Sequence, residues 1–160
     1  MIIKIMDIFI TFIADWLVFP VVLIGGIALL MIKPTDRRYQ MIGKGVMAGL
    51  LALLFAKIGS LFYQGERPFL SAGEVPKAAY LNNPGFPSDH TLFVFAITFI
   101  VWATTKNKPL SIALLIMSSL VALGRILALV HTPIDVAGGI TFAFLAVWAV
   151  FGNSFFSTKK

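Results

Sequence analysis

Long apolar stretches separated by short polar connections make up most of the chain. Five of them reach or approach the ~20 residues that a helix needs to cross a bilayer. They run over about residues 13–32, 41–63, 90–105, 110–129 and 133–154. Each should be a helix, because only a helix satisfies its own backbone hydrogen bonds within one lipid-embedded segment. The pattern therefore predicts an all-α fold, a polytopic transmembrane helical bundle of about five spans.

The N-terminal residues 1–12 have a different pattern, with Ile2, Ile5, Met6 and Phe9 at helical spacing. This segment either extends the first span or lies in the membrane interface as an amphipathic helix, and the pattern favours the interface. No small-residue cleavage site precedes the continuing apolar run, so a removed signal peptide is not expected.

Composition strengthens the membrane assignment. The chain is 59% hydrophobic and only 12% charged, whereas soluble domains carry roughly 25% charged residues. We expect residues 1–160 to form a single membrane-embedded domain, since one bundle uses the whole length. The chain has no cysteine, which excludes disulfides, a thiolate nucleophile and a cysteine-based metal site.

The net charge of +6 comes from basic residues that cluster in particular connections. They are Lys33, Arg37, Arg38 and Lys44 around the first connection, Lys106 and Lys108 in the third, and Lys159 and Lys160 at the C-terminus. Five spans place all three groups on one side, which the positive-inside tendency makes cytoplasmic. The N-terminus and the connections at 64–89 and 130–132 are then outside. Topology explains the basic residues, so no nucleic-acid partner is predicted.

Two glycine pairs lie within the predicted spans, Gly25-Gly26 and Gly138-Gly139. Small residues are typical of helix interfaces in lipid. We expect both pairs to permit close contact between helices rather than to bind a ligand.

Ionisable residues collect at the ends of spans that should face the same side. They are Arg67, Asp89, His90, Arg125, His131 and Asp135, and they include both histidines of the chain. Placing such groups near an apolar bundle costs free energy, so they often mark a functional site. The 26-residue connection at 64–89 also exceeds the usual length of a structural loop. The topology brings these distant residues to one face.

Ser88 is a plausible N-cap for the third span. The backbone N–H groups that follow it would open a helix at the outer face, where a helix N-terminus binds phosphate readily. An ordinary capped helix start is the alternative. It explains Ser88 and Asp89 but does not require His90.

His131 and Asp135 are four residues apart, and Thr132 and Pro133 suit the N-cap and first turn of the last span. Asp135 can reach back to a ring N–H of His131, fix its tautomer and leave the other nitrogen free to attack. The alternative is an interfacial ion pair between Arg125 and Asp135, with His131 as a bystander.

Arg67 follows the second span and brings a planar guanidinium suited to phosphate oxygens. A lone arginine at a helix end is more often a snorkelling anchor. Two arginines, two histidines and a helix N-terminus on one face, however, predict an anion site with a nucleophile and an acid.

These residues resemble the three-part signature of the type-2 phosphatidic-acid phosphatase superfamily. Pro87-Ser88-Asp89-His90 is similar to its Pro-Ser-Gly-His, with Asp for Gly. Arg125, His131 and Asp135 have the spacing of its third part, with Gly124 in place of Ser. Its first part, a Lys followed after six residues by Arg-Pro, is matched only at Arg67-Pro68.

The signature lysine is replaced by Ser60, and the nearest lysine, Lys57, lies ten residues before Arg67. Lys57 either reaches the phosphate from one turn deeper or snorkels to the surface. The Glu-Arg-Pro-Phe and Phe-Pro-Ser-Asp-His-Thr strings look most like the bacitracin-resistance type of undecaprenyl-diphosphate phosphatase. The resemblance covers residues 57–135, and the family normally has six spans.

The resemblance implies roles for the site residues. His131 would attack phosphorus, Asp135 would orient it, and His90 would protonate the leaving oxygen. The phosphate-binding residues would be Arg67, Arg125, Ser88, Asp89 and Lys57. Phosphoryl transfer depends mainly on positioning and on charge around the transferring group, so no metal and no cofactor is implied.

The predicted function is hydrolysis of a lipid phosphate or diphosphate at the extracytoplasmic face of the cell membrane, with undecaprenyl diphosphate as first choice. Phosphatidylglycerophosphate, phosphatidic acid and lipid A phosphate are alternatives, because the motif residues bind only the phosphate group. A more remote alternative is an anion transporter or channel subunit, in which the same charges bind an anion without chemistry. The predicted partners are the substrate and membrane lipids; the sequence does not fix the oligomeric state.

Overall fold

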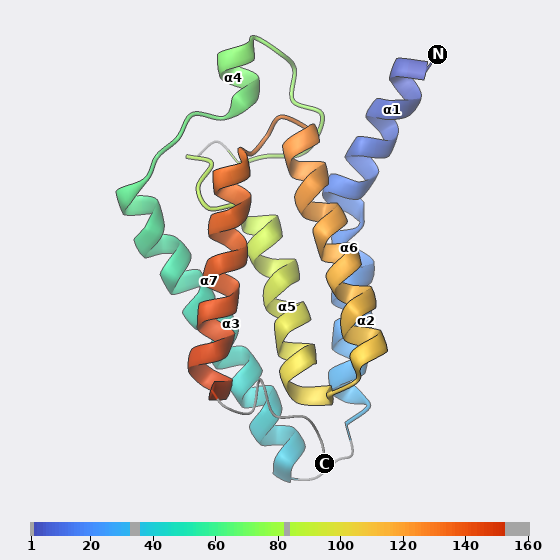
Figure 1. The fold of residues 1–160 in the computed structure, drawn as a ribbon, viewed down its shortest axis with the longest axis vertical. Coiled ribbons are helices and arrows are strands. Elements are labelled where there is room, and N and C mark those ends of the chain that lie inside the picture. Colours follow the sequence, from blue (N-terminus) through green and yellow to red (C-terminus); the bar gives the residue numbers. More distant parts are fainter. Residues whose placement is uncertain (1, 33–35, 82–83, 153–160) are drawn as a thin grey trace.

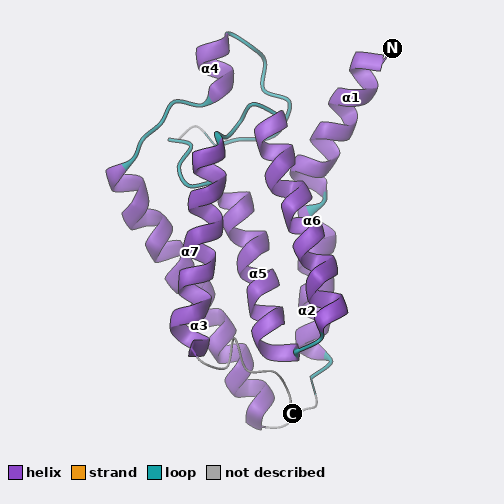
Figure 2. Cartoon of the chain, viewed as in Figure 1, coloured by secondary structure: helices purple, strands orange, loops and turns teal. Residues whose placement is uncertain are grey.

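The computed structural model describes residues 2–32, 36–81 and 84–152, and every regular element in them is helical (Figure 2). In chain order these are α1 (Ile2–Thr11), the π-helical turn η1 (Phe12–Trp16), α2 (Val18–Leu30), α3 (Asp36–Phe62), α4 (Pro68–Ala72), α5 (Asp89–Thr105), α6 (Lys108–Leu127) and α7 (Pro133–Phe151). The predicted all-α fold is confirmed.

Four helical segments are long and apolar enough to cross a membrane: Lys4–Leu30, Asp36–Phe62, Lys108–Leu127 and Pro133–Phe151. The shorter apolar helix α5 has 17 residues. Each of the five predicted stretches coincides with one of these five helices. The boundaries differ by a few residues except at the start of the first span, which the sequence pattern placed near residue 13 and which begins at Lys4 in the structure. Residues 153 and 154, the predicted end of the last span, lie outside the described residues.

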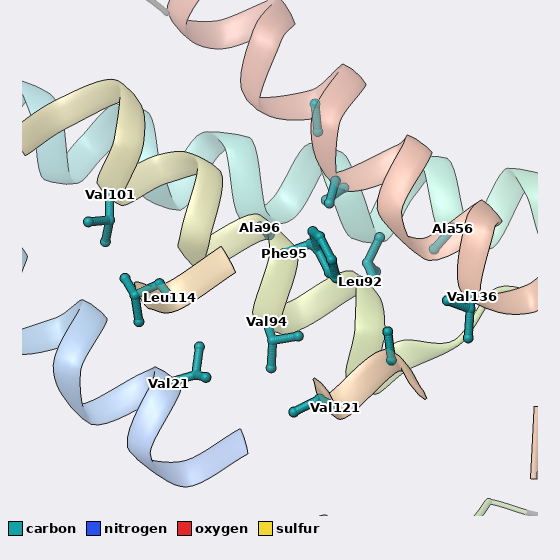
Figure 3. Packing of buried hydrophobic residues seen from close by; sticks show 14 of the residues in the cluster. Val21, Ala56, Leu92, Val94, Phe95, Ala96, Val101, Leu114, Val121 and Val136 are labelled. Carbon is teal, nitrogen blue, oxygen red and sulfur yellow. The ribbon is translucent and has the colours of Figure 1, made fainter. Parts of the chain in front are cut away.

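Helix α5 forms the centre of the bundle and contacts α2, α3, α6 and α7 (Figure 1). A helix that is apolar on all sides is expected in such a position. Figure 3 shows its side chains packed against those of its neighbours. The cluster includes Leu92, Val94, Phe95, Ala96 and Val101 from α5, with Val21, Ala56, Leu114, Val121 and Val136 around them. The start of α5 is thereby fixed relative to every other span.

The N-terminal residues continue the first span. Helix α1 runs through η1 into α2, so that Lys4–Leu30 is one helical segment of 27 residues. At ~1.5 Å per residue this segment is longer than the ~30 Å hydrocarbon core. Of the two arrangements considered for residues 1–12, the structure favours extension of the span, whereas the sequence pattern favoured the interface.

The two ends of the bundle differ in chemistry. The N-terminal end of α1, the connection from α3 to α5 and the connection from α6 to α7 lie at one end (Figure 1). We call this the site end. The start of α3, with Arg37 and Arg38, and the α5–α6 connection, with Lys106, lie at the opposite end (Figure 1). The predicted segregation of these basic residues is confirmed; Lys33, Lys159 and Lys160 lie outside the described residues.

Three of the four paired glycines lie where helices or loops approach closely. A Cβ atom on Gly25 would meet the side chain of Ile97, and one on Gly138 would meet the ring of Phe86. A Cβ atom on Gly139 would lie 2.9 Å from the carbonyl oxygen of Ser88. The prediction of close contact therefore holds for these three, while Gly26 faces open space.

Candidate active site

Residues from four parts of the chain meet at the site end, where one backbone–backbone and one side chain–backbone hydrogen bond join them in pairs. The Ser88 N–H donates to the carbonyl oxygen of Asp135 at 3.0 Å, which fixes the start of α5 against the start of α7. Arg67 Nη1 donates to the carbonyl oxygen of Val130 at 2.8 Å, which ties the loop before α4 to the α6–α7 connection. His131 lies in that connection and is 4% exposed.

Asp135 is held by the cap of its own helix. Thr132 is the N-cap of α7, and a capping box forms in which Asp135 Oδ2 accepts the Thr132 N–H at 2.7 Å. The predicted N-cap and first-turn positions of Thr132 and Pro133 are confirmed. The carboxylate is therefore rigid, and its orientation follows from local sequence.

The contact between His131 and Asp135 differs from the predicted hydrogen bond. His131 Nδ1 lies 3.7 Å from Asp135 Oδ2, which is beyond hydrogen-bonding distance but within range of electrostatic attraction. The capping box fixes the direction of this carboxylate through the Thr132 N–H, and the His131 ring lies beyond its hydrogen-bonding reach. Within the described part of the chain, His131 Nδ1 and Asp135 Oδ1 are buried and have no hydrogen-bond partner.

His131 carries the imidazole best suited to attack. Burial lowers its pKa from the ordinary value of 6.5, and the positive charges of Arg125 and Arg67 act in the same direction, while the Asp135 carboxylate opposes them. The ring is therefore neutral near pH 7, which leaves a lone pair on one nitrogen.

Arg125 is 1% exposed, and its carboxylate partner is Asp15 on η1. Nη1 donates to Asp15 Oδ1 at 2.6 Å, and Nη2 donates to the carbonyl oxygen of Ala79 at 2.7 Å. Nε is buried and without a hydrogen-bond partner among the described residues. The alternative of an Arg125–Asp135 ion pair is wrong, because Arg125 pairs with Asp15 instead.

Arg67 is 6% exposed, so it is not a snorkelling surface anchor. It is the N-cap residue of α4, where Pro68 takes the first helical position. Besides Val130, it bonds the carbonyl oxygen of Leu81 at 3.1 Å, and its guanidinium carbon lies 5.4 Å from the centre of the Tyr80 ring. Burial lowers the pKa of Arg67, and the Asp135 carboxylate opposes this effect. Its position brings a second cation to the site.

Ser88 is the N-cap residue of α5, as predicted, but its side chain makes no capping hydrogen bond. Its hydroxyl oxygen instead accepts from Thr91 Oγ1 at 3.0 Å. His90 follows in the first turn, half-buried, with Nε2 4.0 Å from Asp15 Oδ1. A helix N-terminus, a buried hydroxyl and an imidazole thus face the same end of the bundle.

Asp89 and Lys57 lie at the edge of this group, and both are exposed. They line a cavity of about 320 Å³ together with Ser60 and Gln64. Arg67, Arg125 and His131 are not among the residues that line this cavity. Of the eight predicted site residues, six gather at the site and these two border it. Within the described residues, no group of three or more His, Asp or Glu side chains is arranged to hold a metal ion.

Asp15 is the site residue that the sequence analysis did not identify. It contacts Arg125 across 110 positions of the chain. One signal was available, since Asp15 is an acidic residue within the apolar stretch Phe12–Trp16, and such residues in predicted spans often have a function.

Comparison with known proteins identifies the family of the chain. The family model of the PAP2 superfamily matches residues 44–159. The chain belongs to the PAP2 superfamily. The matched range contains every predicted site residue from Lys57 to Asp135, and Asp15 precedes it.

Two curated relatives are similar over most of the chain. The bacitracin transport permease protein BcrC of Bacillus licheniformis is 28% identical over 141 residues, which cover 88% of this chain and 68% of the relative. The putative undecaprenyl-diphosphatase YbjG of Escherichia coli is 25% identical over 125 residues, covering 73% and 62% respectively. The chain therefore spans about two thirds of the length of these relatives. No solved structure matches it.

Proposed function

We propose that the chain is a lipid phosphatase that hydrolyses a lipid phosphate or diphosphate at the extracytoplasmic face, with undecaprenyl diphosphate as the first candidate. The observation that carries the proposal is a buried, neutral His131 with Asp135 3.7 Å away and the buried cations Arg67 and Arg125 beside it. This arrangement combines a nucleophile with charges that stabilise a transferring phosphoryl group.

In the proposed reaction, a ring nitrogen of His131 attacks the terminal phosphorus, and the bond from phosphorus to the lipid-side oxygen breaks. His90 gives its proton to that oxygen, so the lipid leaves with this oxygen protonated. Water then attacks the phosphohistidine while His90 takes up the proton. Inorganic phosphate departs, and both histidines return to their starting states.

The cations Arg67 and Arg125 would hold the non-bridging oxygens during both steps. The buried Nε of Arg125 is a donor without a partner among the described groups, and a phosphate oxygen would satisfy it. Ser88 and the first-turn N–H groups of α5 would supply further donors. Asp135 would stabilise the imidazolium that forms on His131 after attack. Lys57 and Asp89 would contact the phosphate from the edge of the site.

An apolar cavity supports a substrate with a long hydrocarbon tail. It has a volume of about 520 Å³ and lies between α2, α3 and α5. Val18, Leu50, Leu53 and Phe93 are among its lining residues, and Asp89 and His90 border it. A prenyl or acyl chain in this cavity would place its headgroup beside His90.

One of the two relatives supports a diphosphate as the first substrate to test. One is named as a putative undecaprenyl-diphosphatase and the other as a bacitracin transport permease. Phosphatidylglycerophosphate, phosphatidic acid and lipid A phosphate present the same terminal group, so they are the alternatives within the same chemistry.

The test is phosphate release by the purified chain in detergent and EDTA from undecaprenyl diphosphate, phosphatidylglycerophosphate and phosphatidic acid. We expect release by the wild type, fastest from undecaprenyl diphosphate, and none by His131→Ala. Preference for a glycerolipid would keep the mechanism and change the substrate. Wild-type rates in His131→Ala, or no release from any substrate, would overturn the proposal.

A further inference from the structure

Asp15 links the first span to the catalytic residues in a way that the proposed mechanism does not use. It lies on η1, the π-helical turn between α1 and α2, and turns of this type occur frequently at functional sites. Its Oδ1 accepts from Arg125 Nη1 at 2.6 Å, and its Oδ2 accepts from the Ala79 N–H at 2.8 Å. Both carboxylate oxygens are thus fixed in direction.

The same carboxylate is close to His90. Asp15 Oδ1 lies 4.0 Å from His90 Nε2, and the Asp15 side chain is 18% exposed. His131 has its own carboxylate at 3.7 Å in Asp135. Each of the two histidines of the chain is therefore beside one aspartate, and the two aspartates come from opposite ends of the sequence.

Gly124 is the residue that lets η1 come this close. A Cβ atom at position 124 would lie 2.8 Å from the backbone nitrogen of Ala14 and 2.9 Å from its Cα. These are backbone atoms, so the contact has little freedom to relax. The signature that this chain resembles has serine here. The absence of a side chain at position 124 is thus compatible with the close packing of η1 on α6.

We propose that Asp15 is a positioning residue of the phosphatase site, the carboxylate partner of the acid His90 and the group that holds Arg125 with its Nε free for phosphate. This inference rests on the proposed function, because it takes His90 as the acid and Arg125 as a phosphate ligand. It adds the first span, which lies before the matched PAP2 region, to the catalytic unit.

The charges around His90 predict how its protonation depends on Asp15. The charged or titratable groups that act on the charge of its ring are Arg125 from α6, Asp15 from η1 and His131 from the α6–α7 connection. Of these three, Asp15 carries the negative charge. A carboxylate within about 4–6 Å favours a protonated imidazole. Removing the Asp15 charge leaves His90 beside Arg125 without compensation, so the ring gives up its proton at lower pH.

The test is a pH titration of the imidazole signals by NMR of nitrogen-labelled protein in detergent. The chain has two histidines, so His90→Gln assigns both signals. In Asp15→Asn we expect the His90 midpoint to fall by about one pH unit, the lower end of the range for a carboxylate at this distance. Asp7→Asn is the matched control, since Asp7 lies two turns earlier on the same helical segment and pairs with Lys77 at 2.8 Å.

Phosphate release gives the second readout. In Asp15→Asn we expect kcat to fall by about a hundredfold, the usual order for loss of an effective acid. The limb of the rate profile that reports His90 should move to lower pH together with the His90 midpoint. Asp15→Glu keeps the charge and should restore part of kcat, whereas Asp7→Asn should leave kcat and the profile unchanged.

The two readouts separate this inference from the proposed function. An unchanged His90 midpoint in Asp15→Asn, or an equal shift in Asp7→Asn, would overturn the role of Asp15 whether or not the wild type releases phosphate. A shifted midpoint in a chain that releases no phosphate from any substrate would overturn the proposed function instead. If Asp15→Asn does not fold, the titration of Asp15→Glu decides: its midpoint should stay near the wild-type value, and a fall of about one pH unit would overturn the inference.

Discussion

At the level of single residues, the surroundings of His131 set the conditions under which it can attack. The ring is buried, two arginines face it, and the nearest carboxylate, Asp135, is not hydrogen-bonded to it. Each of the first two features destabilises the imidazolium, and the carboxylate only partly offsets them. The free enzyme thus keeps the nucleophile neutral.

This state predicts the position of the acidic limb in the pH profile of kcat/KM. The neutral ring attacks, so the rate rises as pH rises through the pKa of His131, and that pKa is lowered from 6.5. We expect the midpoint of the acidic limb below pH 6.5. The measurement is phosphate release across the pH range under substrate-limited conditions.

Asp135→Asn tests whether the acidic limb reports the ionisation of His131 or that of the substrate. The Asp135 carboxylate opposes the lowering of the His131 pKa, so its loss should move the acidic limb of the residual activity to still lower pH. A limb that lies above pH 6.5 in the wild type, or that does not move in this variant, would contradict the assignment.

At the level of elements, short local signals and long-range contacts differ in how well the sequence predicted them. The spans were predictable because the bilayer thickness sets their length and apolar character. The cap at Thr132 and Asp135 was predictable because it involves neighbouring residues. The helix α4 within the long connection was not, since its five residues carry no distinct pattern.

The candidate site was predictable where residues followed a motif and topology placed the motifs together. Asp15 was not identified because its contact with Arg125 depends on how η1 packs on α6, which no local pattern encodes. The distance between His131 and Asp135 was missed for a related reason. The capping box with Thr132 sets the direction of the Asp135 carboxylate, and the spacing of the two residues in the sequence does not reveal that direction.

The packing of η1 on α6 gives a prediction about Gly124. Gly124→Ser introduces the signature residue, yet its Cβ would lie 2.8 Å from the Ala14 backbone nitrogen. We expect η1 to move away from α6, with a loss of about 1–3 kcal/mol in the free energy of unfolding. Phosphate release should fall because Asp15 no longer reaches Arg125. The free energy of unfolding and phosphate release are both measured on protein purified in detergent.

Gly26→Ala is the control for this change, because a Cβ atom there meets nothing within 4 Å. It should leave stability and phosphate release near wild-type values. Wild-type activity in Gly124→Ser would show that the close approach of η1 is not required.

The apolar cavity between α2, α3 and α5 gives a second prediction at this level. Gly49 lines the cavity, and a Cβ atom there would meet nothing within 4 Å. Gly49→Phe should therefore fill the cavity without displacing a helix. We expect KM for a long-chain lipid phosphate to rise about tenfold or more, as roughly 1.4 kcal/mol of lost binding requires, while release from a short-chain analogue stays unchanged.

Gly43 offers the matched position on the same helix. It also faces open space but does not line the cavity, so Gly43→Phe should have the KM of the wild type. Equal effects of the two variants on the long-chain substrate would exclude this cavity as the tail site.

At the level of the whole molecule, the bundle separates a basic end from an end that carries the site residues (Figure 1). The positive-inside tendency assigns the basic end to the cytoplasm. A site on the other side would act on lipid headgroups that face outward. The structure shows that the two ends of the bundle differ. Which end faces the cytoplasm stays a prediction.

Orientation can be measured directly because the chain has no cysteine. Glu74→Cys places a thiol after α4 at the site end, and Arg37→Cys places one at the start of α3. Both positions are exposed. A membrane-impermeant maleimide added to intact cells should label Glu74→Cys and not Arg37→Cys, and both should react after lysis. The reverse pattern would place the site in the cytoplasm.

The most direct test of the whole account is to identify the phosphorylated residue during turnover. Wild-type enzyme is mixed with undecaprenyl diphosphate radiolabelled in its terminal phosphate, stopped in alkali within one turnover, and digested for peptide mapping. We expect label on the peptide that contains His131, stable in alkali and released by acid, with none in His131→Ala. Label on a different residue, or full turnover by His131→Ala, would contradict it.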